Sequence, residues 1–116
     1  MSVSFQGVGQ VCATFLGSGL QEGQVVKMSG RKTVSACADG DGFCGVALCC
    51  REDACSVQVG GFVTVKYSGT VPSAGWAELY ANGSGGVRGP GEKETGGVRC
   101  LVADADTTAK TVTLML

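Results

Sequence analysis

The chain has 116 residues, of which 44% are hydrophobic and 6% aromatic, with 20 glycines and two prolines. This length suits one domain, 1–116, with a core built mainly from Val, Ala, Leu and Cys. A net charge of −1 and scattered basic residues argue against a nucleic-acid-binding surface, and no apolar stretch is long enough to predict a membrane span.

Short β-rich runs bounded by Gly, Ser, Asn or Asp follow one another through nearly the whole chain. In the last run Val112, Leu114 and Leu116 alternate with Thr111 and Thr113, which is typical of a strand with one buried face. No segment shows a sustained helical period, so the pattern predicts an all-β fold, a compact antiparallel β-barrel or sandwich. The expected strands are 11–16, 24–28, 33–37, 43–50, 55–59, 62–67, 76–80, 98–103 and 111–116.

Two places in this series are ambiguous. Residues 74–81 are the one weak helical candidate, and we interpret them as a strand or a single turn. Around Gly60-Gly61 the inward-facing residues change phase, from the set that includes Val59 to the set that begins at Val63. We therefore expect the glycine pair to form a hairpin or a bulge.

Two stretches, 23–59 and 75–114, read as two copies of one β unit. Each opens on a glycine and a strand, and continues with a turn, a strand onset, a polar loop and a Gly-Val pair. Two copies predict a barrel or sandwich with an internal pseudo-twofold repeat, because a solenoid needs more copies. The landmarks are Gly23, Gly30, Val34, 39–42 and Gly45-Val46 in the first copy, and Gly75, 82–83, Val87, 92–94 and Gly97-Val98 in the second.

Residues 1–19 fall outside both copies and have a β alternation of their own. A strand without an internal partner must pair with the body or with another chain, so we expect this segment to be a contact arm. We interpret Trp76 mainly as a cap on one end of the core, with an exposed contact role as the alternative. The candidate residues for capsid or subunit contact are Val3, Phe5, Val11, Phe15 and Trp76.

Seven cysteines, an odd number without an export signal, favour reduced thiols in a protein made in a cytoplasm. We expect them mainly to pack as small hydrophobes. The alternative is a zinc site made from Cys44, Cys49, Cys50 and Cys55. Cys49 and Cys50 are neighbours on an expected strand and point to opposite faces, which opposes that alternative. We therefore expect no metal and no cofactor.

Catalytic patterns are scarce in a chain without histidine. Asp104 and Asp106 resemble a carboxylate pair, but a loop of this composition is typical of a turn whose side chains bond their own backbone. Residues 39–42 begin like a calcium loop, yet Cys50 stands where the loop needs its final acid. We expect that the protein is not an enzyme.

Glycine and hydrophobic spacing over almost the whole chain resembles the capsid decoration, or cement, proteins of tailed bacteriophages. The residues concerned are 42–48, 55–65, Gly75 to Tyr80, 98–104 and 111–114. The resemblance implies a non-enzymatic virion protein on the capsid exterior, made in the host cytoplasm. It further implies a homo-oligomer, with a trimer favoured, that binds the major capsid protein and reinforces the shell. The seven cysteines depart from the alanine and valine that are usual at such positions.

Two other functions remain open. One is another phage structural subunit of the tail, head fibre or baseplate. The other is a small β-barrel module that binds carbohydrate or peptide, which would be expected to show several exposed aromatic side chains. One tryptophan and two tyrosines weaken that second alternative.

Overall fold

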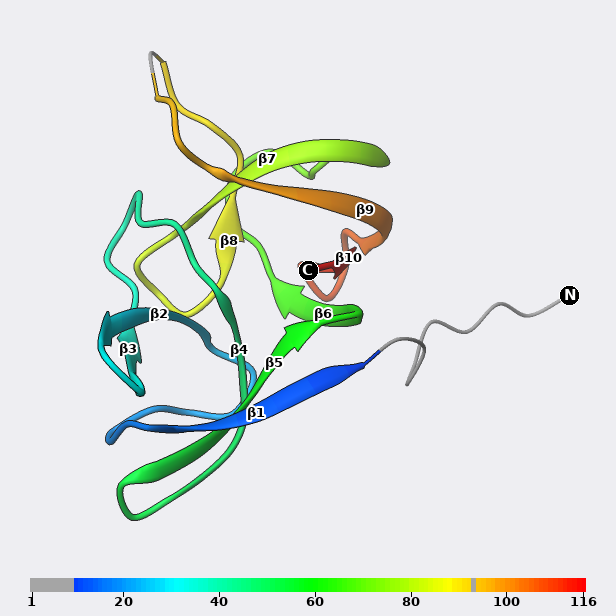
Figure 1. The fold of residues 1–116 in the computed structure, drawn as a ribbon. Helices are drawn as coiled ribbons and strands as arrows, with labels where there is room; N and C mark the ends of the chain where they lie inside the picture. Colours follow the sequence, from blue (N-terminus) through cyan, green and yellow to red (C-terminus); the bar gives the residue numbers. More distant parts are fainter. Residues whose placement is uncertain (1–9, 93) are drawn as a thin grey trace, which may run out of the picture.

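The computed structural model describes residues 10–92 and 94–116, which form ten strands in two five-stranded sheets (Figure 1). The all-β prediction is confirmed, and 75–81 form a strand. No helix within these residues is long and apolar enough to cross a membrane. Each predicted strand is present, and the short β8 is additional. The strands are β1 Val11–Leu16, β2 Val25–Gly30, β3 Thr33–Ala36, β4 Gly45–Arg51, β5 Ala54–Gly60, β6 Phe62–Lys66, β7 Gly75–Ala81, β8 Val87–Arg88, β9 Val98–Asp106 and β10 Thr111–Met115.

The two sheets have the same strand order. The first is a closed barrel in the order β1-β3-β2-β4-β5, and the second runs β6-β10-β9-β7-β8. When β1 to β5 are matched in turn with β6 to β10, the second order is the first one read in the opposite direction around the barrel. In the first sheet a parallel pairing of Leu16 with Thr33 joins β1 to β3. In the second sheet a single parallel bridge from Tyr67 to Val87 joins the corresponding ends. The predicted internal repeat is therefore present, with β4 as the counterpart of β9.

A shared irregularity aligns the two halves residue by residue. Ala47 lies opposite Val57 in the first half, and the next register pair skips one residue of β4. Val102 lies opposite Leu114 in the second half, and the next pair likewise skips Ala103 of β9. A bulge at the equivalent point of the equivalent hairpin indicates that the two halves share one register. This register makes Leu101 the counterpart of Val46, which corrects the predicted match of Gly45-Val46 with Gly97-Val98.

The structural repeat begins one strand earlier than the sequence predicts. β1 pairs with β5 as β6 pairs with β10, so residues 11–16, expected outside both copies, form the first strand of the first half. Residues 1–9 of the expected contact arm lie outside the described part of the chain. The hairpin or bulge predicted at Gly60-Gly61 is wrong, because β5 and β6 belong to different sheets. Gly61, with a φ of 86°, links the two halves.

The core is shared between the halves because adjacent residues of β2 and β4 project to opposite faces. Val26 and Ala47 point into the first barrel, together with Val57 and Cys55. Their neighbours Val25 and Val46, each 1% exposed, instead join the cluster of the second half. That cluster also contains Val65, Tyr67, Leu79, Ala81, Val87, Cys100, Val102, Val112 and Leu114.

The cysteines only partly follow the sequence prediction. Cys50 and Cys55 form a disulfide, because the tight β4–β5 hairpin places them opposite each other with their Cα atoms 4.0 Å apart. Cys37 and Cys100 are buried as expected, and burial raises the pKa of each thiol to about 11. The free Cys12 and Cys49 are exposed, which corrects the expectation that such residues fill the core.

Candidate interaction surface

Side chains from four strands form a row across the outer face of the second sheet. Trp76 of β7 lies opposite Leu101 of β9, Leu101 opposite Met115 of β10, and Met115 opposite Phe62 of β6. Directly paired residues project from the same face of a sheet, so the four share one surface. Trp76 is 57% exposed and the other three are half-buried. We call these four residues the apolar row.

Trp76 is the most exposed member of the row. The alternation of β7 turns Ala77 and Leu79 inward and leaves the indole outside, so the core-capping interpretation is wrong. The guanidinium of Arg99 lies 5.1 Å from the centre of a Trp76 ring. An exposed indole stacked with an arginine is the type of group that anchors protein contacts.

Polar residues occupy the rest of this face. The hydroxyl groups of Thr64 and Thr113 lie 2.9 Å apart, and Thr113 pairs with Asp104. Oδ1 of Asp106 accepts the backbone N–H groups of Thr108 and Ala109, which confirms the predicted turn. The acidic end of β9 therefore lies beside the apolar row.

The predicted contact residues do not come together in one patch. Val11 is 55% exposed at the start of β1, whereas Phe15 is half-buried against the core of the first barrel. β1 pairs with β5 and β3 of the first half, while Trp76 belongs to the second half (Figure 1). Val3 and Phe5 lie outside the described residues. Leu101, Met115 and Phe62 were missed, although their outward positions follow from strand alternation once the register is known.

One edge of β1 is largely open. β5 pairs with β1 along the whole strand, from Val11 to Leu16. On its other side, the one pairing that the described residues make is between Leu16 and Thr33 of β3. An open backbone edge of this kind can accept a further strand.

An ionic cluster joins the two halves near the β3–β4 loop. Arg88 of β8 donates from Nε to Oδ1 of Asp39 at 2.7 Å, and its guanidinium lies 5.4 Å from the centre of the Tyr80 ring. Glu94 accepts two further hydrogen bonds from Arg88, which lower the pKa of the carboxyl to about 2. Oδ2 of Asp41 accepts hydrogen bonds from Nζ of Lys27 and from the Ala38 N–H, and these contacts lower the pKa of Asp41. The carboxylates of this loop are thus occupied in holding the chain together.

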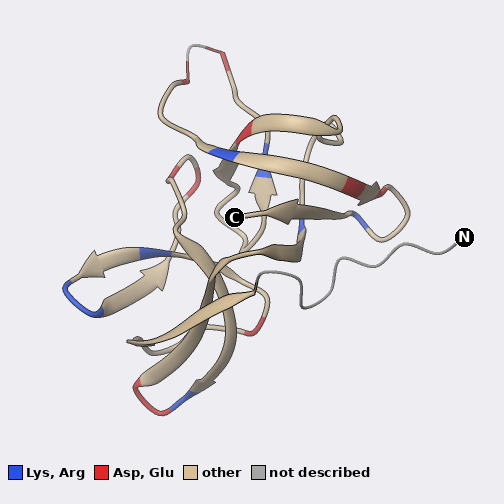
Figure 2. Ribbon diagram, turned by 45° about the vertical axis from the view of Figure 1, so that its right-hand side comes forward, with Lys and Arg blue, Asp and Glu red and all other residues tan. Residues whose placement is uncertain are grey.

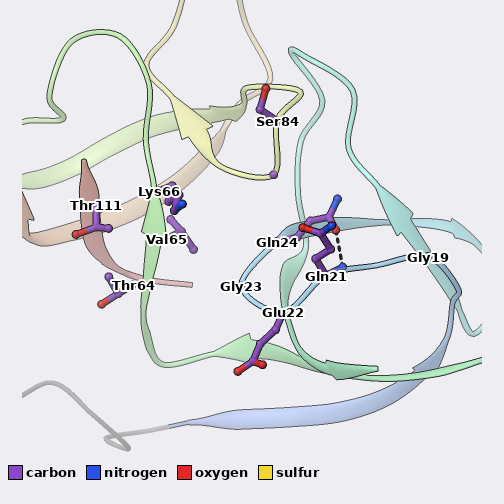
Figure 3. Close-up of a pocket in the computed structure, with 11 residues that line it drawn as sticks. Gly19, Gln21, Glu22, Gly23, Gln24, Thr64, Val65, Lys66, Ser84 and Thr111 are labelled. Carbon is purple, nitrogen blue, oxygen red and sulfur yellow. Dashed lines mark hydrogen bonds between the residues drawn. The ribbon is translucent and has the colours of Figure 1, made fainter. Parts of the chain in front are cut away.

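A pocket of ≈ 520 Å³ lies where the β1–β2 loop approaches the second half (Figure 3). Gln21 and Gln24 line one side, where the Gln21 N–H donates to Oε1 of Gln24 at 2.9 Å. Thr64 and Lys66 line the opposite side, and Ser84 of the β7–β8 turn also lines the pocket. None of the described lining residues is aromatic, and no three Cys, Asp or Glu side chains of the described residues gather as metal ligands.

The arrangement is suited to binding through strand edges and apolar contacts, and β1 and the apolar row are among its exposed elements. Comparison with protein-family models finds no match to this chain, and comparison with curated proteins finds none either.

Proposed function

We propose that this protein is a structural virion protein that binds the outer surface of a tailed-phage capsid and stabilises the shell. The resemblance in glycine and hydrophobic spacing supports this proposal. So does a compact all-β body with exposed apolar side chains and a net charge of only −1. Attachment would then depend on apolar and backbone contacts more than on long-range electrostatic attraction.

The open edge of β1 is the observation that carries the proposal. A strand of the major capsid protein can pair with this edge by β-augmentation, in which backbone hydrogen bonds give affinity and side chains give specificity. Val11 offers an exposed apolar side chain at the start of the same strand. Many identical copies acting on one shell convert modest affinity per copy into strong collective attachment.

The test uses preformed heads that lack this protein. Full-length protein is expected to co-sediment with such heads and to raise their rupture temperature. Deletion of residues 1–9, or Val11→Asp, is expected to weaken binding. Val71→Asp is the matched control, because Val71 is also exposed but lies in the β6–β7 connection.

Two outcomes test the capsid-binding function and the choice of contact strand separately. Full-length protein that neither binds the heads nor stabilises them overturns the capsid proposal. Equal binding by the Val11→Asp and Val71→Asp variants overturns the assignment of β1 as the contact strand.

A further inference from the structure

The apolar row has a counterpart in the first half. The shared bulge aligns Ala47 with Val102, so the preceding residues Val46 and Leu101 are equivalent. Val46 pairs with Val25 of β2, just as Leu101 pairs with Trp76 of β7. Val46 also pairs with Gln58 of β5, as Leu101 pairs with Met115 of β10.

The two rows differ most in exposure on β2 and β7, whereas Cys12 of β1, the counterpart of Phe62, is exposed. Val25 and Val46 are each 1% exposed and Gln58 is 2% exposed, whereas Trp76 is 57% exposed. The first row is covered because it packs into the core cluster of the second half. The chain entering the second half also covers it, since Nε2 of Gln58 donates to the Phe62 carbonyl at 2.9 Å. The second row has the same position on its sheet, and the described residues form no third β unit that packs against it.

The surface that covers the first row also has a counterpart. It includes Leu79 of β7, which is 1% exposed, and the β7–β8 turn, where the Gly85 carbonyl accepts the Val25 N–H at 3.0 Å. Because Trp76 is equivalent to Val25, Leu79 is equivalent to Met28 of β2, which is 46% exposed. Leu16 lies at the same end of the first barrel and is 52% exposed. We call Leu16 and Met28 the apolar end.

We propose that copies of this chain associate head to tail, with the apolar row of one copy docked on the apolar end of the next. This contact repeats between chains the packing that already joins the two halves within each chain. The β2–β3 hairpin of the apolar end and strands β9 and β10 of the apolar row lie at opposite sides of the ribbon in Figure 1, so the two surfaces do not meet within one copy.

Charges of opposite sign lie beside part of the two surfaces. Arg31 and Lys32 form the β2–β3 turn next to the apolar end, whereas Asp104 and Asp106 lie beside the apolar row (Figure 2). The face of the apolar row also carries the positive charges of Arg99, which lies against Trp76, and Lys66, which pairs with Thr111. Opposite charges at the rim of an interface favour the correct pairing of surfaces. A contact between two different surfaces is heterologous, so successive copies close into a ring or extend into a filament. This inference goes beyond capsid binding and does not depend on it.

Sedimentation velocity of the full-length protein over a concentration series tests the proposal. Trp76→Ser and Met28→Ser are each expected to weaken association about 30-fold, as for loss of a central interface anchor. Val71→Ser is the control with an exposed valine outside both surfaces. Unchanged thermal unfolding shows that each variant is folded, and a non-reducing gel excludes copies linked through the exposed Cys12 and Cys49.

A mixing experiment distinguishes head-to-tail docking from pairing of one apolar row with another. Trp76→Ser retains the apolar end and Met28→Ser retains the apolar row, so a mixture of the two is expected to form heterodimers but no larger species. Wild-type protein that stays monomeric overturns the proposal. So does Met28→Ser that assembles like wild type, because that result indicates pairing of one row with another. The Trp76→Ser variant bound to heads as a monomer would show that capsid attachment and self-association use different surfaces.

Discussion

Arg88 and Glu94 form a two-point ion pair, in which Nη1 donates to Oε1 at 2.6 Å and Nη2 donates to Oε2 at 2.9 Å. The remaining Nε–H binds Asp39 of the first half. One guanidinium therefore holds the β8–β9 loop and the β3–β4 loop in a fixed relation, and fork-to-fork geometry of this kind is the strongest that Arg makes with a carboxylate.

Replacement Glu94→Gln is expected to reduce the loss of stability in acid. The pKa of Glu94 is lowered from 4.5 to about 2, chiefly by the hydrogen bonds from Arg88 and next by the Gly91 N–H. A carboxyl with a depressed folded pKa stabilises the protein above its unfolded pKa, and this contribution disappears as the pH falls through the folded value. Denaturant midpoints measured from pH 7 to 2 should therefore fall less for the variant between about pH 4.5 and 2.

The control for this prediction is Glu92→Gln, an exposed glutamate in the same loop. Its midpoints should follow those of the wild type. Equal acid sensitivity of the Glu94→Gln variant and the wild type would show that the ion pair does not contribute to the pH dependence.

Replacement Gly45→Ala is expected to destabilise the protein by about 1–3 kcal/mol, the usual cost of overpacking. A Cβ on Gly45 would lie 2.5 Å from the carbonyl oxygen of Gln58 and 2.7 Å from Cγ1 of Val57, so the backbone of β5 would have to move. Urea unfolding measures the change. Gly89→Ala should be close to neutral, because a Cβ there meets nothing within 4 Å. A Gly45→Ala variant as stable as Gly89→Ala would contradict the close approach of β4 to β5.

Thiol labelling should distinguish exposed thiols, thiols that are buried or half-buried, and the two cysteines of the disulfide. In the folded protein a maleimide is expected to react rapidly with Cys12 and Cys49, which are exposed, and slowly with the buried Cys37 and Cys100. Burial raises the pKa of the latter two thiols to about 11, which leaves little reactive thiolate near pH 7. Cys44 is half-buried, and its pKa is also raised by burial.

Mass spectrometry of the labelled protein checks the assignment. Unfolding without a reductant should expose five thiols, and reduction should add those of Cys50 and Cys55. The Cys12→Ser and Cys49→Ser variants should each lose one fast site. Seven thiols in the unfolded, unreduced protein would contradict the disulfide.

Much of the fold could be predicted because its signals are local. Alternation in 111–116 and glycine-bounded runs placed the strands, and the repeated order of landmarks indicated two similar halves. β8 was missed because two residues are too few to show a period. The first strand of each half was left out of the repeat because β1 and β6 share an alternating pattern but no landmark glycine.

The candidate surface was harder to predict because it depends on register. Trp76 was identified as notable, but its exposure follows from pairing with Leu101, and through Leu101 with Met115, on strands distant in sequence. The disulfide likewise depends on Cys50 and Cys55 meeting across a hairpin. Spacing along the chain does not show such encounters.

Composition, alternation and glycine placement by themselves determined an all-β chain with an internal repeat, because these properties act over a few neighbouring residues. Only the tertiary structure decided which of two equivalent rows is buried. Val25 and Trp76 have the same place in their sheets, yet the second half covers one and leaves the other exposed. Among the described residues the two β units make one contact of this kind, and it covers the row of the first half but not the row of the second.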